Sequence, residues 1–182
     1  MRAISYLLLL AFLALIIAGC SHSQQNIVNN SEVVYMKLSS QAFADSGVIP
    51  AKFTCNGADI NPELSISSVP TSAKSLALIV DDPDAPSRVW VHWVVFNINP
   101  GTTKIAENSV PAGAVQGTTD FKTAEYGGPC PPSGTHRYVF KLYALDTSLN
   151  LGSSATKKDV ESAMQGHILA QATLTGLYKQ QK

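Results

Sequence analysis

Two histidines stand where a proline-rich loop runs into a strand-like segment, and both could donate hydrogen bonds to a ligand. The first segment, DDPDAPSRVWVHW, covers residues 81–93, and the second, GGPCPPSGTHRY, covers residues 127–138. Proline restricts the backbone, so such loops hold a fixed shape at little further entropy cost. Imidazole N–H groups donate well to the oxygens of a small anion. Side by side, the two junctions predict a preorganised anion pocket, lined by Asp82, Asp84, Pro86, Trp90, His92, Gly128, Pro131, His136 and Tyr138.

The alternation of side chains along a strand predicts the neighbours of each histidine. On this rule two sets of residues each share a face: Trp90, His92, Val94 and Phe96, and then His136, Tyr138, Phe140 and Leu142. Asp82 is placed to accept a hydrogen bond from an imidazole and to fix its tautomer. The glycines before Pro129 would let backbone N–H groups approach the same anion.

Each of these residues also has a purely structural interpretation. His92 alone could be a buried core histidine, and Asp84 could cap backbone N–H groups in a turn. Arg137 falls on the opposite face from His136, which favours a salt bridge over ligand contact. Trp93 is expected in the core, and His167 in the interior of a helix. The DPDAP loop must also reverse within very few residues. X–Pro bonds adopt the cis form most cheaply, so we expect a cis bond at Ala85–Pro86.

The elements that position the two histidines are mostly strands. Strand-like segments, rich in β-branched and aromatic residues, occur at residues 33–38, 64–67, 76–80, 90–97, 138–145 and 170–178. The segments at residues 76–80 and 90–97 are hydrophobic on both faces, which predicts a central sheet covered on two sides. One helix is expected after the capping box that Thr156 forms with Asp159, with apolar spacing at Val160, Ala163, Met164, His167 and Ile168.

The N-terminal sequence indicates a lipoprotein leader that is not part of the folded domain. Residues 1–19 carry Arg2 and a short apolar run, and they end in Ile-Ala-Gly before Cys20, where diacylglycerol would be attached. A plain secretory signal with an incidental cysteine is the alternative. Ser21 in place of aspartate favours the outer membrane or the cell surface over the inner membrane. The polar residues 20–33 predict a tether, and residues 34–182 a single domain.

With Cys20 lipidated, Cys55 and Cys130 remain in an oxidising compartment, which favours a disulfide between them. Two buried free thiols are the alternative. A bridge at Cys130 would anchor the loop that precedes His136.

The two loop–strand segments resemble the signature regions of the phosphatidylethanolamine-binding protein family, also called the Raf-kinase-inhibitor-like family. The signatures stand at residues 82–86 with His92-Trp93, and at residues 128–132 with His136-Arg137-Tyr138. The segments at 50–64 and 166–178 are similar to the bacterial and archaeal branch. The resemblance implies a mainly β fold with peripheral helices, in which a large central sheet packs with a smaller one. Eukaryotic members continue into a helix beside the pocket, and this sequence ends at Lys182, so we expect a more open pocket.

Composition and missing motifs narrow the function. The chain has 13 basic and 13 acidic residues and no basic cluster, which argues against a nucleic-acid partner. Neither an HExxH metal motif nor a GxSxG nucleophile elbow occurs, and no cofactor is expected. We therefore expect a non-catalytic, envelope-anchored protein that binds a small anion or a phosphorylated head group and reaches the membrane through its lipid. The alternative is an inhibitor of a protease, a kinase or a host protein, and an enzyme is the third candidate.

Overall fold

The computed structural model describes residues 35–179, which form two β-sheets and one α-helix. The expected leader, Cys20 and nearly all of the tether lie outside the described residues. The elements in chain order are β1 (Lys37–Ser39), β2 (Gly47–Val48), the 3₁₀ turn η1 (Ala51–Phe53), β3 (Leu64–Ser67), β4 (Ser75–Asp82), β5 (Trp90–Ile98), β6 (Lys104–Ile105), β7 (Val115–Gln116), β8 (Thr135–Leu145), α1 (Lys157–Met164) and β9 (Ile168–Lys179). No helix in this part of the chain is both long and apolar enough to cross a membrane.

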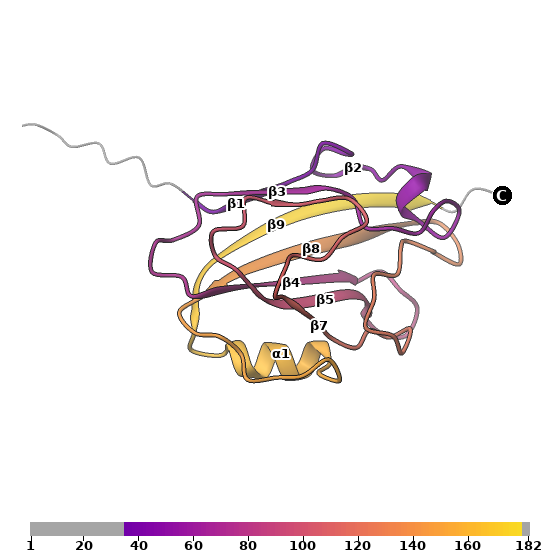
Figure 1. Cartoon of the computed structure of the whole chain (residues 1–182). Coiled ribbons are helices and arrows are strands. Elements are labelled where there is room, and N and C mark those ends of the chain that lie inside the picture. Colours follow the sequence, from indigo (N-terminus) through magenta and orange to yellow (C-terminus); the bar gives the residue numbers. More distant parts are fainter. Residues whose placement is uncertain (1–34, 180–182) are drawn as a thin grey trace, which may run out of the picture. The chain divides into compact units, whose positions relative to one another are not determined.

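The large sheet has the strand order β2-β9-β8-β4-β5-β7, and the small sheet has the order β1-β3-β6. All pairings are antiparallel except that of β2 with β9. The small sheet lies over one face of the large sheet, and α1 lies over the other (Figure 1). The fold is therefore mainly β with a large and a small sheet, as the sequence predicts.

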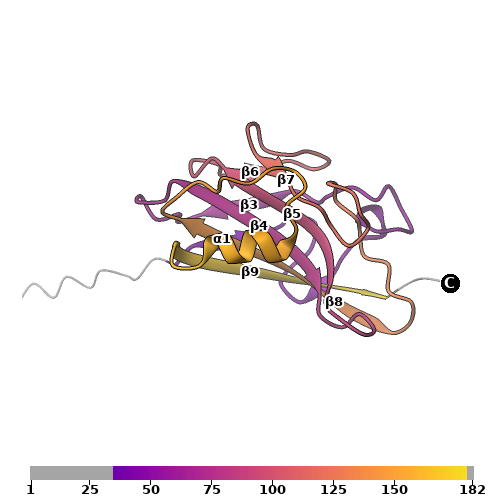
Figure 2. The same cartoon turned by 90° about the horizontal axis from the view of Figure 1, so that it is seen from below.

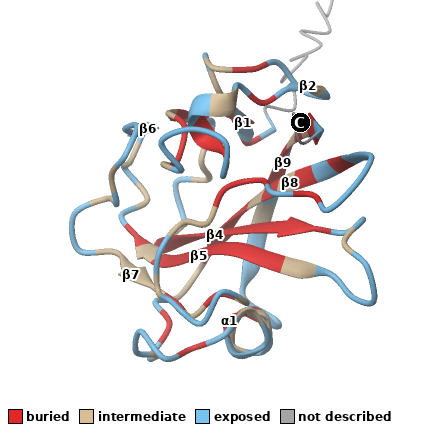
Figure 3. Cartoon of the chain, turned by 90° about the vertical axis from the view of Figure 1, so that its right-hand side faces the viewer, coloured by how far each residue is buried: buried red, intermediate tan, exposed pale blue. Residues whose placement is uncertain are grey.

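The centre of the large sheet is buried on both faces, as its apolar sequence predicts. All eight residues of β4 are buried (Figure 3). The apolar side chains among them alternate between two hydrophobic clusters. Leu78 and Val80 belong to the cluster under the small sheet, and Ala77 and Ile79 to the cluster under α1. This double coverage holds β4 rigidly, so the loop that follows it starts from a fixed point.

The helix begins at the predicted capping box and ends earlier than expected. Thr156 caps the helix and exchanges hydrogen bonds with Asp159, whereas α1 ends at Met164. Gly166 then takes a positive φ of 79°, which turns the chain into β9. His167 therefore lies outside the helix interior and is half-exposed, with its Nδ1 2.7 Å from Asp146 Oδ1. Figure 2 shows α1 lying across one face of the large sheet.

The predicted cis bond at Ala85–Pro86 is wrong, because every peptide bond in the described chain is trans. The loop reverses by other means. The Asp82 carboxylate accepts a hydrogen bond from the backbone N–H of Asp84, an Asx turn, and Ser87 takes a left-handed φ of 76°. These two local features supply the reversal that the cis bond was expected to make.

Candidate functional site

Asp82 and His136 form the centre of the candidate site. Asp82 ends β4 and His136 lies at the start of the neighbouring β8, so both side chains reach the same face of the large sheet. The Nδ1 atom of His136 donates to Oδ2 of Asp82 at 2.7 Å, and both residues are buried. The carboxylate thus fixes which ring nitrogen carries the proton and leaves Nε2 for a ligand. This contact is the one that the sequence predicts for Asp82.

His92 lies on the predicted strand, but simple alternation assigns it to the wrong face. Val80 pairs with Trp93 and Asp81 pairs with Val91, so His92 is the extra residue of a β-bulge. Val94 and Phe96 consequently pack under α1, whereas the His92 ring packs edge-on against Tyr138, with centroids 5.1 Å apart. The bulge is what aims His92 at the same face as His136.

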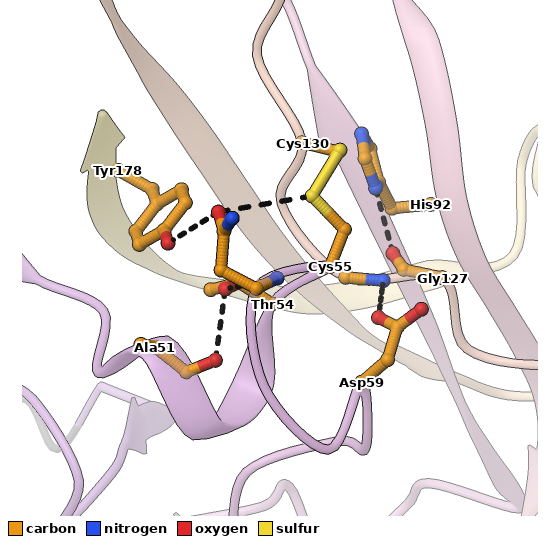
Figure 4. Close-up of a disulfide and its surroundings, with 10 residues drawn as sticks. Ala51, Thr54, Cys55, Asp59, His92, Gly127, Cys130 and Tyr178 are labelled. Atoms are coloured by element: carbon orange, nitrogen blue, oxygen red, sulfur yellow. Dashed lines mark hydrogen bonds between the residues drawn. A yellow bond between two sulfur atoms is a disulfide. The ribbon is translucent and has the colours of Figure 1, made fainter. Parts of the chain in front are cut away.

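The surroundings of the His92 ring favour its neutral form. Its Nδ1 donates to the carbonyl oxygen of Gly127 at 2.7 Å (Figure 4). Burial lowers the pKa of His92 below its ordinary value of 6.5, and the Gly127 carbonyl and Asp82 only partly oppose this shift. With Nδ1 protonated, Nε2 carries a lone pair and accepts a hydrogen bond. In the absence of a ligand the lowered pKa therefore favours a lone pair at Nε2 of His92 near neutral pH, whereas the sequence argument treats the ring as a donor to an anion.

The two glycines of the second loop do not offer their N–H groups to a ligand. Gly127 donates to the His92 carbonyl at 3.0 Å, and Gly128 donates to Oδ1 of Asp59 at 2.7 Å. The lack of a side chain allows a close approach instead. A Cβ at Gly127 would collide with the Phe121 ring, and a Cβ at Gly128 would collide with the Phe53 carbonyl. The glycines allow close packing of the loop, and the expected backbone contact with the anion is not available.

The predicted disulfide joins Cys55 to Cys130, two residues 75 positions apart whose Cα atoms are 5.5 Å apart (Figure 4). The backbone N–H of Cys55 also donates to the Pro129 carbonyl. Both links tie the loop before His136 to the segment after η1. The bond therefore sits beside the site, on the loop whose Gly127 carbonyl orients His92.

Aromatic rings form the wall of the site. Phe121 packs edge-on against both Trp90 and His92, with centroid distances of 5.6 and 5.3 Å. The Tyr138 hydroxyl is buried and has no hydrogen-bond partner among the described residues. Burial raises the pKa of Tyr138, and the negative charge of Asp82 raises it further, so the hydroxyl stays protonated. An unpaired buried hydroxyl is costly, which makes it a candidate ligand contact.

Within the described chain, the remaining predicted site residues make no hydrogen bond to Asp82, His92 or His136 that would place them at the centre of the candidate site, apart from the turn contact of the Asp84 backbone with Asp82. Arg137 donates to both carboxylate oxygens of Asp84, from its backbone N–H and Nε to Oδ2 and from Nη2 to Oδ1. The Arg137 side chain lowers the pKa of Asp84 to about 2. Asp84 is thus the turn and salt-bridge residue of the structural interpretation. Pro131 is buried in the second loop, and Pro86 is exposed in the first.

The arrangement suits a small ligand that carries both a hydroxyl group and oxygen acceptors. His92 offers a lone pair, Tyr138 offers a hydroxyl proton, and His136 is oriented by a carboxylate. The described residues contain no cluster of three or more His, Cys, Asp or Glu side chains that could hold a metal ion.

Comparison with known proteins identifies the family. The family model of the phosphatidylethanolamine-binding protein matches residues 39–179. The chain belongs to the phosphatidylethanolamine-binding protein family. A UPF0098 protein from Methanothermobacter thermautotrophicus is 56% identical over 149 residues, which cover 79% of this chain and 99% of that protein. A UPF0098 protein from Chlamydia muridarum is 47% identical over 150 residues, covering 80% and 99%.

Solved structures of phosphatidylethanolamine-binding proteins share the fold. A homologue from Chlamydia trachomatis, CT736, superposes with a TM-score of 0.78 at 44% identity and covers 81% of this chain and 99% of its own. YbcL of Escherichia coli, described as a new member of the mammalian family, gives a TM-score of 0.77 at 32% identity, covering 81% and 100%. These likenesses confirm the family and fold that the two loop–strand signatures predict.

Two site residues and one contact escape prediction from the sequence. Phe121 lies in a polar segment without strand pattern, Asp59 stands 69 residues from its partner Gly128, and the Gly127 carbonyl orients the His92 ring. Nothing in the local sequence marks Phe121. The family signature at residues 128–132 points to the region of Gly127, but not to its contact with His92.

Proposed function

We propose that this chain is a non-catalytic binding protein of the cell envelope, attached to lipid at Cys20, whose pocket binds phosphate or a phosphorylated head group. The observation that carries the proposal is the matched orientation of the two histidines. Each ring uses its Nδ1 for a hydrogen bond within the protein, His136 to Asp82 and His92 to the Gly127 carbonyl. Each ring therefore has its Nε2 left for a ligand. Hydrolytic or transfer chemistry would need an activated nucleophile, and neither histidine is paired to one.

The neutral state of His92 favours phosphate over other small anions. A phosphate monoester or inorganic phosphate near neutral pH has both bare oxygens and, in its monoanionic form, a P–OH group. The hydroxyl can donate to Nε2 of His92, while the bare oxygens accept from the Tyr138 hydroxyl and from His136 when its Nε2 is protonated. The buried, unpartnered Tyr138 hydroxyl would then have its hydrogen bond.

The test is calorimetric titration of the protein with inorganic phosphate and with phosphoethanolamine, before and after treatment with a chelator. We expect binding that survives chelation, is lost in His136→Ala and is kept in His167→Ala. His167 is a matched control because it also pairs its Nδ1 with an aspartate, yet it lies at the opposite end of β9. Binding that is absent, or indifferent to His136, would remove the basis of the proposal.

A second candidate function is inhibition of a protein target. Two large apolar side chains, Val89 and Phe121, are exposed next to Trp90 at the rim of the site. Such side chains serve as anchors in protein interfaces. Proteases and kinases would be screened with the unmodified protein and with Phe121→Ser. This function requires that the unmodified protein inhibits a target and that Phe121→Ser does not.

A further inference from the structure

An apolar patch lies at the end of the molecule that is remote from the candidate site. Its exposed members are Tyr35, Ile168 and Leu169, with 73%, 47% and 40% of their surfaces accessible. Between β1, β3 and β9 they border a groove of about 540 Å³, lined by Tyr35, Met36, Ser68, Val69, Pro70, Thr71, Leu169, Ala170 and Gln171. We call Tyr35, Ile168, Leu169 and this groove the entry patch, because β1 and β9 both begin beside it.

The register of the large sheet sets the distance between the entry patch and the site. Ile168 pairs with Leu145 at one end of β8 and β9, whereas His136 pairs with Tyr178 at the other. Nine residues of strand separate Leu169 from Tyr178, which is about 30 Å at the usual rise per residue. In Figure 1 the start of β1 and the start of β9 lie on the left, and the end of β9 on the right.

The short sequence separation between Tyr35 and Cys20 suggests what covers the patch. Fifteen positions separate the two residues, and a chain of that length reaches at most about 50 Å. If Cys20 is lipidated, the entry patch is the part of the domain that is held nearest to the bilayer. We propose that the entry patch is a lipid-contact surface, which seats the domain on the membrane with the candidate site facing away.

The chemistry of the patch agrees with an interfacial position. Tyrosine is enriched at membrane interfaces, where its ring is buried and its hydroxyl stays in water. Lys37 stands two residues from Tyr35, and the backbone of Lys74 donates to the carbonyl of Leu145, the partner of Ile168. Both lysines are exposed. Their charges would favour anionic head groups around the patch.

This inference rests on the proposed lipid anchor at Cys20, and its test distinguishes the two. The lipidated full-length protein is reconstituted into vesicles of phosphatidylcholine and phosphatidylglycerol whose acyl chains carry bromine, a quencher of tryptophan fluorescence. Two reporters are compared, Leu169→Trp in the patch and Val48→Trp at the site end. Val48 is a matched control because it is also an exposed apolar strand residue, and it pairs with Leu177 beside the site. The unmodified protein supplies the background of Trp90 and Trp93.

We expect several-fold stronger quenching of Leu169→Trp than of Val48→Trp, and loss of that difference when Ile168 is also replaced by Asp. Tyr35→Trp is a second reporter that needs no change in a strand. Vesicle flotation measures the anchor separately. Protein that floats with equal quenching at both ends overturns the patch and leaves the anchor standing, whereas protein that does not float overturns both. A dimer that protects Leu169→Trp from the quencher would make a second copy the occupant and overturn the lipid assignment.

Discussion

Asp82 and His136 are joined by a hydrogen bond of 2.7 Å between Oδ2 and Nδ1, at the point where β4 ends and β8 begins. The preceding residue, Asp81, points to the other face of the sheet. There its Oδ2 binds Lys141 at 2.9 Å and Lys157 of α1 at 2.5 Å. The consecutive carboxylates of Asp81 and Asp82 therefore bind on opposite faces of the sheet at the end of β4, Asp82 in the candidate site and Asp81 under the helix. This double attachment keeps the Asp82 side chain in position for His136.

Replacing Asp82 with Asn should weaken phosphate binding. The amide keeps the shape but can either accept from Nδ1 or donate to it, so the His136 ring is no longer held in one tautomer and one orientation towards the ligand. Carboxylates that orient metal-binding histidines change affinity on the order of tenfold when they are removed, and we expect a similar loss here. Calorimetry measures it, and ¹⁵N ring shifts report the tautomer. Asp84→Asn, which breaks an exposed pair with Arg137, is the control and should leave affinity unchanged.

Replacing Tyr138 with Phe should separate stability from binding. The hydroxyl is buried without a hydrogen-bond partner among the described residues. Its removal should therefore raise the free energy of unfolding of the ligand-free protein, by about 1 kcal/mol. Phosphate affinity should fall in the same variant, because the ligand loses a donor. Urea unfolding and calorimetry give the two quantities. A variant that is less stable and binds phosphate as before would contradict a role for this hydroxyl in the ligand site.

Phosphate should bind more tightly than sulfate at neutral pH, and sulfate should bind more tightly as the pH falls. Sulfate has no proton to donate to the lone pair of His92, so it needs the protonated ring. Burial lowers the pKa of His92 below 6.5, which means that the ring gains its proton only on the acid side of that value. Binding of sulfate favours the protonated form, so its affinity should rise as the pH falls from 8 through and below 6.5. Titrations with both anions across this range test the sign, and a sulfate affinity that is independent of pH would count against the site.

Loss of the Cys55–Cys130 bond should destabilise the protein and loosen the loop before His136. Closing a chain segment of 75 residues contributes about 4 kcal/mol in the chain-entropy account. The double variant Cys55→Ser with Cys130→Ser should show this loss in denaturant unfolding, together with weaker phosphate binding because Gly127 orients His92 from the same loop. Equal stability with and without the bond would show that the backbone contacts of the loop are sufficient.

Replacing Cys20 with Ser should release the protein into the soluble fraction of the envelope. The expected lipid attachment requires the Cys20 thiol, which the serine hydroxyl does not replace. Fractionation and mass spectrometry of the mature N-terminus measure the result. A variant that remains in the membrane and is cleaved at the same position would contradict lipidation at Cys20.

Local sequence was sufficient for features that depend on neighbouring residues. The two-sided burial of β4 follows from its continuous apolar run, and the start of α1 follows from the Thr156–Asp159 capping box. The two loop–strand signatures were sufficient for the family. The end of α1 was misplaced because apolar spacing continues past Gly166, whose positive φ overrides it.

The sequence by itself determined the family, the central strands and the placing of Asp82 as an acceptor for an imidazole, since each follows from a local pattern or from a signature. That the imidazole is the one of His136 is seen only in the structure. Only the tertiary structure decided the geometry of the site. The bulge that turns His92 depends on how β5 pairs with β4, and a one-residue shift in register reverses the face of a side chain. Phe121 and Asp59 enter through loops that fold back from distant positions. The neutral state of His92 depends on its burial, which no residue near it in the chain sets.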